Sequence, residues 1–351
     1  MKIFSNQLHH LHKGRQEMFR GRLVDCNEVP QRLEHVLSEL ERRPVGELLT
    51  PSGDLPLDEA LLRVHSPEYL TFLSTAWDEW VSLSPDNVSR DALPSVWPLP
   101  GNQAFRTDRP PLNFAAKLGQ YAFDAGTPLM SGSWTAAREG AACALAAAQA
   151  VSKGESSAVA LTRPPGHHAG KAYMGGYCFL NNAAIAAQHL SSQGLQRIAV
   201  MDIDYHHGNG TQAIFDERSD VYTVSIHGDP QTEYPFFLGH ADERGTGAGE
   251  GYNLNFPLPK GTAFETWYGS LQKALQVIAD FSPQALVVPL GLDTYEGDPI
   301  SGFKLKSVHY LQVGRALASL RLPTVFTLEG GYAVADFGRN TVNVLEGFQS
   351  I

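Results

Sequence analysis

The chain has 351 residues, of which 43% are hydrophobic and 18% charged, and its formal net charge at pH 7 is −10. This composition is typical of a soluble globular protein, and the negative balance argues against nucleic acid and anionic membranes as partners while suiting a cationic ligand. The three cysteines are too widely spaced for a disulfide framework or a zinc finger, which favours a reducing compartment. Without a signal peptide or an apolar run of membrane-spanning length, we expect a cytoplasmic protein.

The first part of the chain gives few regular signals. Residues 2–4 could form a first strand, and a polar, basic segment covers residues 9–22. Apolar residues at helical spacing follow Ser66-Pro67, which predicts a helix that starts there. Six prolines and little periodicity mark residues 82–111, where we expect a long functional or interfacial loop rather than a domain boundary.

From residue 134 onward, predicted helices and strands alternate. The helices cover about 134–151, 182–191, 211–215, 264–279 and 308–320, and each precedes an apolar strand, while a last helix closes the chain. Ser307 is the expected N-cap of the helix at 308–320. Such alternation predicts βαβ crossovers and therefore an α/β fold, a single domain over residues 1–351 with a parallel β-sheet flanked by helices on both faces.

The most informative stretch is residues 198–210, IAVMDIDYHHGNG. An apolar strand is followed by Asp202, Asp204 and His206, which point the same way if the chain stays extended. Charged groups that leave a core must be paired or bound to a metal, because burying them unpaired costs several kcal/mol. The alternative is a capping network around the turn at 208–210. A metal site is the better interpretation.

Other predicted strands also end in chemically reactive residues. These are His167 and His168, then Asp204 and His206, then His227, then Asp293, then Tyr332. Ligand sites in open α/β sheets lie at the carboxyl ends of the strands. The sequence therefore predicts one functional site at this edge of the sheet.

Asp293 is the natural third ligand of a metal held by Asp204 and His206. Two carboxylates and one imidazole suit zinc, whose bound water can reach a pKa of about 7. Fe(II), Co(II) and Mn(II) accept the same donors. The alternative for Asp293 is a cap or turn residue before Gly297.

The adjacent His167 and His168 follow a rigid turn at 164–166, Pro-Pro-Gly, which suggests proton handling rather than a surface accident. Each ring needs an orienting partner, for which Asp202 and Asn209 are the nearest candidates. An amide partner would orient a ring while stabilising an imidazolium less than a carboxylate does.

Tyr332 follows the flexible Glu-Gly-Gly at 329–331 and could donate its hydroxyl to a developing oxyanion, or simply close a turn. Competing nucleophile motifs are missing from the sequence, which has no Gly-x-Ser-x-Gly elbow and no phosphate loop ending in Gly-Lys-Ser/Thr. We interpret Cys178 as a packing residue.

Four ordered motifs, RPPGHHA, DIDYHHGNGTQ, GLDTYEGDP and EGGY, resemble the zinc-dependent, histone-deacetylase-like amidohydrolases of the arginase/deacetylase fold. The phrase GGYCFLNNAAIAAQ is most similar to the bacterial acetylpolyamine amidohydrolases. The resemblance implies that Asp204, His206 and Asp293 bind zinc and that metal-bound water attacks an acetamide. It makes His168 the general base and acid, His167 an electrostatic helper held by Asp202, and Tyr332 the oxyanion donor.

The resemblance also implies structural potassium and a narrow substrate tunnel. The positions that match potassium sites are Asp202, Asp204, His206, Ser225 and Ile226, with a second set at Phe215, Arg218, Val221 and Tyr252. Tyr177 and Tyr234 would wall the tunnel, and Gly176 would line it.

In the acetylpolyamine group, the loop that corresponds to residues 82–132 mediates dimerisation and narrows the tunnel, so we expect a homodimer. Glu17 falls where the group binds the distal ammonium of its substrate, although a solvated surface carboxylate is the alternative. Two further acidic positions of the pattern are Ala115 and Gly126 here, with Asp124 nearby. This departure favours short diamines.

The function expected from these observations is metal-dependent removal of acetyl groups from small acetylated diamines and polyamines. One rival is a protein N-acetyl-lysine deacetylase, against which the insertion at 82–132 argues. Another is a non-catalytic binding module, which would predict the loss of a ligand, of His168 or of Tyr332. All of them are present.

Overall fold

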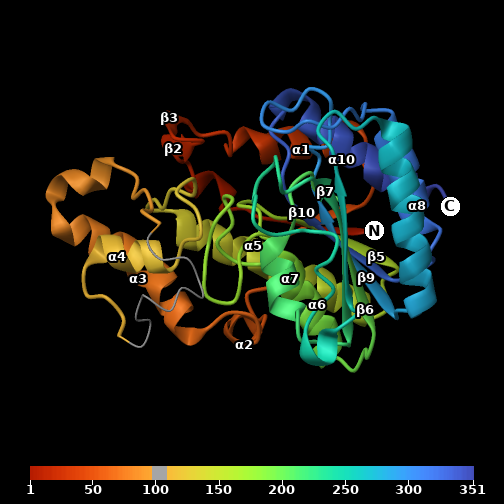
Figure 1. The fold of residues 1–351 in the computed structure, drawn as a ribbon, viewed down its shortest axis with the longest axis horizontal. Coiled ribbons are helices and arrows are strands. Elements are labelled where there is room, and N and C mark those ends of the chain that lie inside the picture. The colour runs from red at the N-terminus through yellow and green to blue at the C-terminus, as the bar shows by residue number, and fades with distance from the viewer. Residues whose placement is uncertain (97–108) are drawn as a thin grey trace.

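The computed structural model describes residues 1–96 and 109–351, and its centre is one eight-stranded sheet (Figure 1). Every pair of neighbouring strands in this sheet is parallel, which confirms the predicted fold class. The order across the sheet is β4 (Glu47–Leu49), β1 (Lys2–Ser5), β5 (Ser157–Leu161), β10 (Thr324–Leu328), β9 (Ala285–Leu290), β6 (Ile198–Asp202), β7 (Val221–Gly228) and β8 (Asn253–Leu258).

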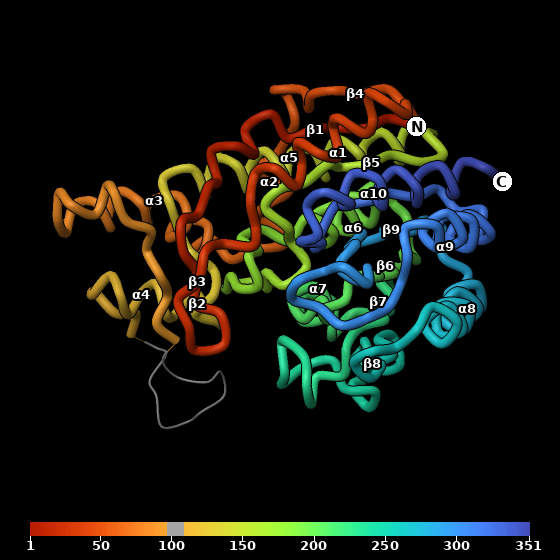
Figure 2. Tube along the Cα trace, turned by 90° about the horizontal axis from the view of Figure 1, so that it is seen from above, coloured from red at the N-terminus to blue at the C-terminus, as the bar shows by residue number. Residues whose placement is uncertain are grey.

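Helices cover both faces of the sheet, which Figure 2 shows from above. One face packs against α2 (Leu57–Leu62), α3 (Pro67–Leu83), α5 (Ser133–Ser152) and α6 (Asn182–Ser192). The other packs against α1 (Gln31–Arg42), α8 (Phe264–Phe281), α9 (His309–Ala318) and α10 (Val334–Gln349). In β5, Ala158 and Ala160 enter the first core and Val159 and Leu161 the second, because side chains alternate along a strand. Burial on both faces explains the continuous apolar runs of the central strands.

Local signals account for some of the helix boundaries. Ser66 caps α3, its Oγ accepting the N–H of Tyr69 at 3.3 Å, and α8 is followed by the C-cap residue Ser282, whose φ is +54°. The predicted Ser307 cap is wrong. The α9 helix has Val308 at its N-cap without a side-chain cap, while the Ser307 carbonyl accepts a hydrogen bond from Asn343 instead. Within the described ranges, no helix is long and apolar enough to cross a membrane.

Several elements were not predicted. The strands β4 and β8 carried too little alternation to be recognised, and β8 is an edge strand that contains Pro257. The helix α1 was missed although its buried Leu33, Val36 and Leu40 recur at helical spacing. The polar segment at 9–22 contains a short helix, η1 (His9–Leu11), and part of an antiparallel hairpin made by β2 (Gln16–Phe19) and β3 (Arg22–Asp25).

The insertion predicted at 82–132 is more structured than a loop, although its residues 97–108 lie outside the described ranges. It contains η2 (Pro85–Ser89) and α4 (Phe114–Gln120). Asn113 caps α4 by accepting the N–H of Ala116 at 3.3 Å. The remaining short helices are α7 (Asn209–Phe215) and η3 (Gly247–Gly249).

Candidate active site

A tunnel with a volume of about 330 Å³ opens where the loops that follow β5, β6 and β10 meet. Its wall includes His168, His206 and Tyr332 from these loops, together with residues of the β2–β3 hairpin and of the 233–238 loop. His168 is 3% exposed, whereas Phe237 is 79% exposed. The lining therefore runs from buried polar groups at its deep end to an open mouth.

Asp204, His206 and Asp293 form a buried cluster at the deep end of the tunnel, and their ligand atoms all lie within 4.8 Å of one another. Nδ1 of His206 is 2.9 Å from Oδ2 of Asp293 and 3.4 Å from Oδ1 of Asp204. A Cβ added to Gly330 would lie 2.6 Å from Oδ2 of both aspartates, so a residue without a side chain is required there. This set of oxygen and nitrogen donors fits zinc.

We expected these ligands to converge by strand alternation, but β6 already ends at Asp202. Two successive turns bring them together. Oδ1 of Asp202 accepts the N–H of Asp204 at 3.0 Å, and Oδ1 of Asp204 accepts the N–H of His206 at 2.9 Å. Short acidic side chains that bond the backbone two residues ahead make such turns.

A second group of possible metal ligands, made by His167, Cys178 and Glu329, already has protein partners. Oε2 of Glu329 accepts the N–H groups of Gly166 at 2.6 Å and His167 at 3.1 Å, and Sγ of Cys178 donates to the Gly176 carbonyl at 3.3 Å. Burial raises the pKa of the Cys178 thiol well above its usual value. We therefore interpret this group as structural support for the histidine loop, the loop after β5 that carries His167 and His168.

The tandem histidines have different partners. Nδ1 of His167 lies 2.9 Å from Oδ2 of Asp202, whereas Nδ1 of His168 lies 2.7 Å from Oδ1 of Asn209. Burial lowers the pKa of His168 well below its usual value, and His167 and His206 add to this effect. Burial opposes charge on His167 as well, but Asp204 and Asp202 raise the pKa of His167 to about 10. His168 is consequently the neutral ring of the pair.

Tyr332 lines the tunnel, and the peptide group that precedes it is held at both its N–H and its carbonyl. Its N–H donates to Oδ2 of Asp298 at 2.7 Å, and Arg32 donates from Nε to the Gly331 carbonyl at 2.7 Å. The Arg32 guanidinium also stacks 4.9 Å from the Tyr332 ring centroid. Burial raises the pKa of the Tyr332 hydroxyl well above its usual value, so it remains a proton donor. Sequence reasoning missed Arg32, which belongs to no motif with a recognisable spacing. It also missed Asp298, which lies within the GLDTYEGDP motif but was given no role there.

Tyr177 and Tyr234 both line the tunnel, next to different catalytic candidates. The Tyr177 ring lies 5.5 Å from the Tyr332 ring, and the Tyr234 ring lies 5.1 Å from His168. Oδ2 of Asp124 accepts both the Tyr234 hydroxyl at 2.7 Å and the N–H of Gly176 at 2.8 Å. Asp124 therefore ties the two walls together.

Glu17 is 1% exposed, so the alternative of a solvated surface carboxylate is wrong. Its Oε1 accepts the Tyr177 hydroxyl at 2.8 Å and a hydrogen bond from Nδ2 of Asn27 at 2.8 Å. It is not among the residues that line the tunnel. The structure places Glu17 behind Tyr177, outside the tunnel lining.

The positions considered for potassium gather in two places. Ser225 lies beside Asp202 in the register of β6 and β7, with Ile226 next to it and Asp204 and His206 in the loop after β6. The second set, Phe215, Arg218, Val221 and Tyr252, lies around the start of β7, where Arg218 donates from its N–H to the Phe215 carbonyl at 2.9 Å. His227, predicted near the site, is bonded to Ser225 and to the Gly239 carbonyl.

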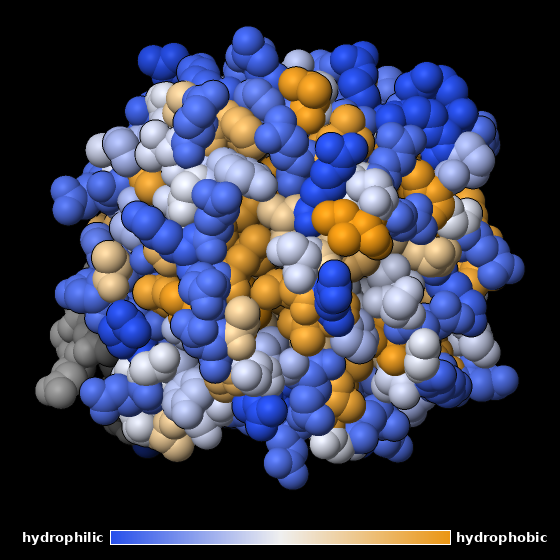
Figure 3. All heavy atoms as spheres, turned by 90° about the vertical axis from the view of Figure 1, so that its right-hand side faces the viewer, coloured by the Kyte–Doolittle hydropathy of each residue, from blue (hydrophilic) through white to orange (hydrophobic). Residues whose placement is uncertain are grey.

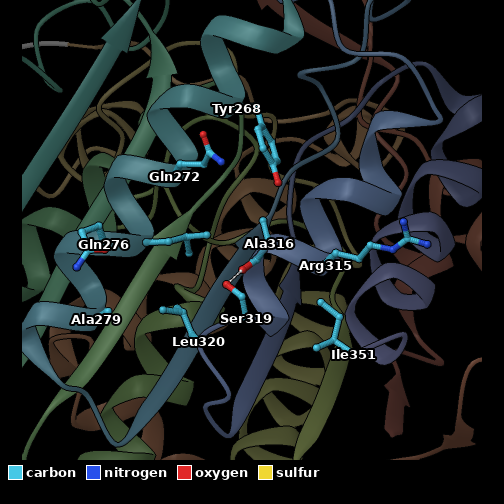
Figure 4. Close-up of a pocket in the computed structure, with 10 residues that line it drawn as sticks. Tyr268, Gln272, Gln276, Ala279, Arg315, Ala316, Ser319, Leu320 and Ile351 are labelled. Carbon is cyan, nitrogen blue, oxygen red and sulfur yellow. Dashed lines mark hydrogen bonds between the residues drawn. The ribbon is translucent and has the colours of Figure 1, made fainter.

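A larger cavity, of about 490 Å³, lies between α8 and α9 on another side of the molecule. Figure 3 looks onto the side with α8 and shows apolar surface in a furrow bordered by polar side chains. In Figure 4 the labelled residues around the cavity are mostly amides, alkyl groups and hydroxyls, with Arg315 at one edge. Arg315 donates to Oγ of Ser350 at 3.2 Å. This lining offers no cluster of acid, base and metal ligands such as the tunnel has at its deep end.

Comparison with known proteins identifies the family. Residues 26–348 match the histone deacetylase domain. The chain belongs to the histone deacetylase family. Acetylpolyamine amidohydrolase 1 of Pseudomonas aeruginosa is 47% identical to it over 91% of this chain and 90% of that protein. Acetylpolyamine amidohydrolase of Mycoplana ramosa is 41% identical over 91% of both chains.

The fold agrees with this assignment to the histone deacetylase family. A crystal structure of acetylpolyamine aminohydrolase from Burkholderia pseudomallei has a TM-score of 0.92 and 37% identity, covering 100% of this chain and 99% of that one. The expected resemblance to acetylpolyamine amidohydrolases is therefore confirmed in sequence and in fold. The chain is accordingly an enzyme of the amide-hydrolysing class that we expected.

Proposed function

We propose that this enzyme is a zinc-dependent amidohydrolase that removes the acetyl group from small acetylated amines. Acetylputrescine and acetylcadaverine are the first candidates, and acetylspermidine is a longer one. The observation that carries the proposal is the buried cluster of Asp204, His206 and Asp293 at the deep end of a narrow tunnel, beside a neutral His168. The names of the acetylpolyamine amidohydrolases that resemble this chain support the substrate class.

Asp204, His206 and Asp293 would hold the zinc ion, and Fe(II), Co(II) or Mn(II) could occupy the same donors. Bound there, the cation supplies a Lewis acid that polarises an amide carbonyl and acidifies a water molecule. His168 would take up the proton of the attacking water at Nε2, because its Nδ1–H is held by Asn209. It then passes the proton to the leaving amine, and the products are acetate and the free amine.

The remaining catalytic groups are assigned by their partners. The Tyr332 hydroxyl donates to the oxygen that becomes negative during attack. His167, charged through its contact with Asp202, stabilises negative charge nearby without itself transferring the proton. Gly176 leaves room for the His168 ring, since a Cβ there would lie 2.2 Å from Cδ2 of that ring.

Substrate binding is assigned to the tunnel walls. Tyr177 and Tyr234 would flank the aliphatic chain of an acetylated amine, with Gly176 between them and His168. Glu17 would contribute through the hydroxyl of Tyr177. The net charge of −10 favours the approach of a cation.

We infer structural potassium at the two sets of positions around the start and end of β7, a homodimer formed through residues 82–132, and a cytoplasmic location. Elemental analysis after dialysis tests for potassium, and sedimentation measurements on the purified chain test for the dimer. A monomer at micromolar concentration would contradict the dimer.

The decisive experiment is a deacetylation assay with N-acetylputrescine, N-acetylcadaverine, acetylspermidine and an acetyl-lysine peptide, with and without a chelator. We expect turnover of the small amines, its loss on chelation and its return with added zinc. The Asp293→Asn variant should lose both activity and bound metal, whereas the exposed Glu296→Gln, three residues away, should lose neither. Preference for the peptide would instead support a protein-lysine deacetylase, and full activity of the metal-free protein would overturn the proposal.

A further inference from the structure

The tip of the β2–β3 hairpin forms part of the tunnel mouth. Met18, Phe19, Arg20 and Gly21 all belong to the lining. Arg20 and Gly21 make the two-residue turn, with φ values of +47° and +80°. Asparagine, aspartate or glycine ordinarily occupies a turn position with positive φ, because a larger side chain is strained there. An arginine at this position therefore needs an explanation other than turn formation.

Arg20 is held at the mouth by a buried carboxylate. Its Nη2 lies 3.5 Å from Oε2 of Glu233, whose side chain is 3% exposed. Glu233 is the residue before Tyr234, which lines the tunnel. Nζ of Lys260 lies 3.6 Å from Oε1 of the same carboxylate. Two cations thus share one anion, which leaves this part of the rim with a net positive charge.

The exposed fraction of the Arg20 side chain shows that it lies at the outer end of the tunnel. Its side chain is 47% exposed, whereas His206, at the deep end, is 8% exposed. The positive charge is therefore presented where a substrate enters, well away from the acid–base groups. A charge at a narrow, low-dielectric opening influences passing ions more strongly than one on open surface.

The one carboxylate of the described tunnel lining keeps its charge but is fixed to the wall by hydrogen bonds. Asp124 is the acidic member of that lining, and four donors already occupy its oxygens. They are the N–H groups of Gly126 and Gly176 and the hydroxyls of Thr127 and Tyr234. Asp124 therefore offers its negative charge beside Gly176 and Tyr234 within the tunnel, whereas an ammonium group at the mouth meets the guanidinium of Arg20.

We propose that Arg20 is a specificity-determining residue that selects against acetylated amines whose chains carry an ammonium group out to the mouth. The inference rests on the proposed function and deepens it. A monoacetylated diamine has one ammonium group, a few methylenes from the amide. A monoacetylated triamine has a second one further along the chain, which must pass or face Arg20 and is repelled. The enzyme therefore prefers short acetylated diamines.

The test compares kcat/KM for N-acetylputrescine, acetylspermidine and the neutral N-butylacetamide at low ionic strength. We expect Arg20→Gln to raise the ratio of acetylspermidine to acetylputrescine by about three- to tenfold, and to leave N-butylacetamide unchanged. Arg20→Lys should keep the wild-type ratio because it keeps the charge. Arg22→Gln removes an exposed charge from the same hairpin, outside the lining, and should change the ratio less than twofold.

Salt provides an independent measurement. Added salt should raise the wild-type ratio towards that of Arg20→Gln, because ions screen the repulsion. If the enzyme hydrolyses acetylputrescine but Arg20→Gln and salt leave the ratio unchanged, the charge filter is wrong and the proposed function stands. If no acetylated amine is hydrolysed by the metal-loaded enzyme, the proposed function fails and this inference fails with it.

Discussion

Oδ1 of Asn209 lies 2.7 Å from Nδ1 of His168, while the neighbouring His167 faces the carboxylate of Asp202 at 2.9 Å. An amide oxygen can only accept a hydrogen bond, so the proton of His168 is at Nδ1 and its Nε2 is free to accept another. An amide also stabilises an imidazolium less than a carboxylate does. The two adjacent rings are thereby divided into a neutral base and a charged helper.

Replacing His168 by Ala should remove proton transfer, which contributes about 10²–10⁴-fold to a rate of this kind. Asn209→Asp should instead keep the ring in place and raise its pKa, so that the acidic limb of the kcat/KM profile moves to higher pH. The measurement is kcat/KM for N-acetylputrescine across pH, with the exposed His10→Ala as control. A His168→Ala enzyme that keeps most of its activity across pH would end the assignment.

Tyr332→Phe should reduce kcat by a factor that corresponds to about 2–4 kcal/mol, as expected for the loss of one oxyanion donor. The ring and its stacking on Arg32 remain, so KM and stability should change little. Steady-state kinetics and thermal unfolding test both statements. Tyr268→Phe, a change in α8 at the cavity between α8 and α9, is the control. An unchanged kcat in the Tyr332 variant would show that the hydroxyl takes no part.

Glu17→Gln should affect substrates with and without an ammonium group alike. Its carboxylate accepts the Tyr177 hydroxyl, and its place behind that ring separates it from the tunnel. The variant therefore loosens a wall instead of removing a direct partner of the substrate. We expect KM for N-acetylputrescine and N-butylacetamide to rise by similar factors. A rise confined to the diamine would restore the direct contact that the sequence pattern suggested.

His65 makes stability depend on pH. It is buried, with Nδ1 2.9 Å from the Gly170 carbonyl and Nε2 accepting the N–H of Asn181 at 3.0 Å, and burial lowers its pKa to about 4. Because the unfolded pKa is 6.5, the unfolded chain binds more protons between these values, and stability is lost as the pH falls through that window.

Wild-type protein should therefore lose roughly 2 kcal/mol more than His65→Gln between about pH 7 and pH 5. Denaturant unfolding of both proteins at each pH measures this difference. The exposed His10→Gln should lose as much as the wild type. Parallel pH profiles for the wild type and His65→Gln would contradict the prediction.

The parallel sheet and the approach of Asp204, His206 and Asp293 could be predicted because each depends on a local pattern, an apolar strand followed by polar residues. The long-range contacts that shape the wall and the mouth of the tunnel could not be predicted. Tyr177 reaches Glu17 across 160 residues of sequence, and Arg20 reaches Glu233 across an even longer stretch. Single-sequence patterns carry no information about such pairs. The geometry of the turn after β6 was also missed, since Asp202 and Asp204 bond the backbone instead of extending the strand.

The buried carboxylate of Glu28 links two loops of the active site through two arginines. One oxygen lies 2.8 Å from Nη1 of Arg32, which holds the loop carrying Tyr332, and the other lies 2.9 Å from Nη2 of Arg163, at the start of the histidine loop. The positions of the His168 ring and of the Tyr332 phenol are thus coupled through the buried carboxylate of Glu28. Neither loop can shift without straining the other, so a disturbance at either one should misalign both catalytic groups together.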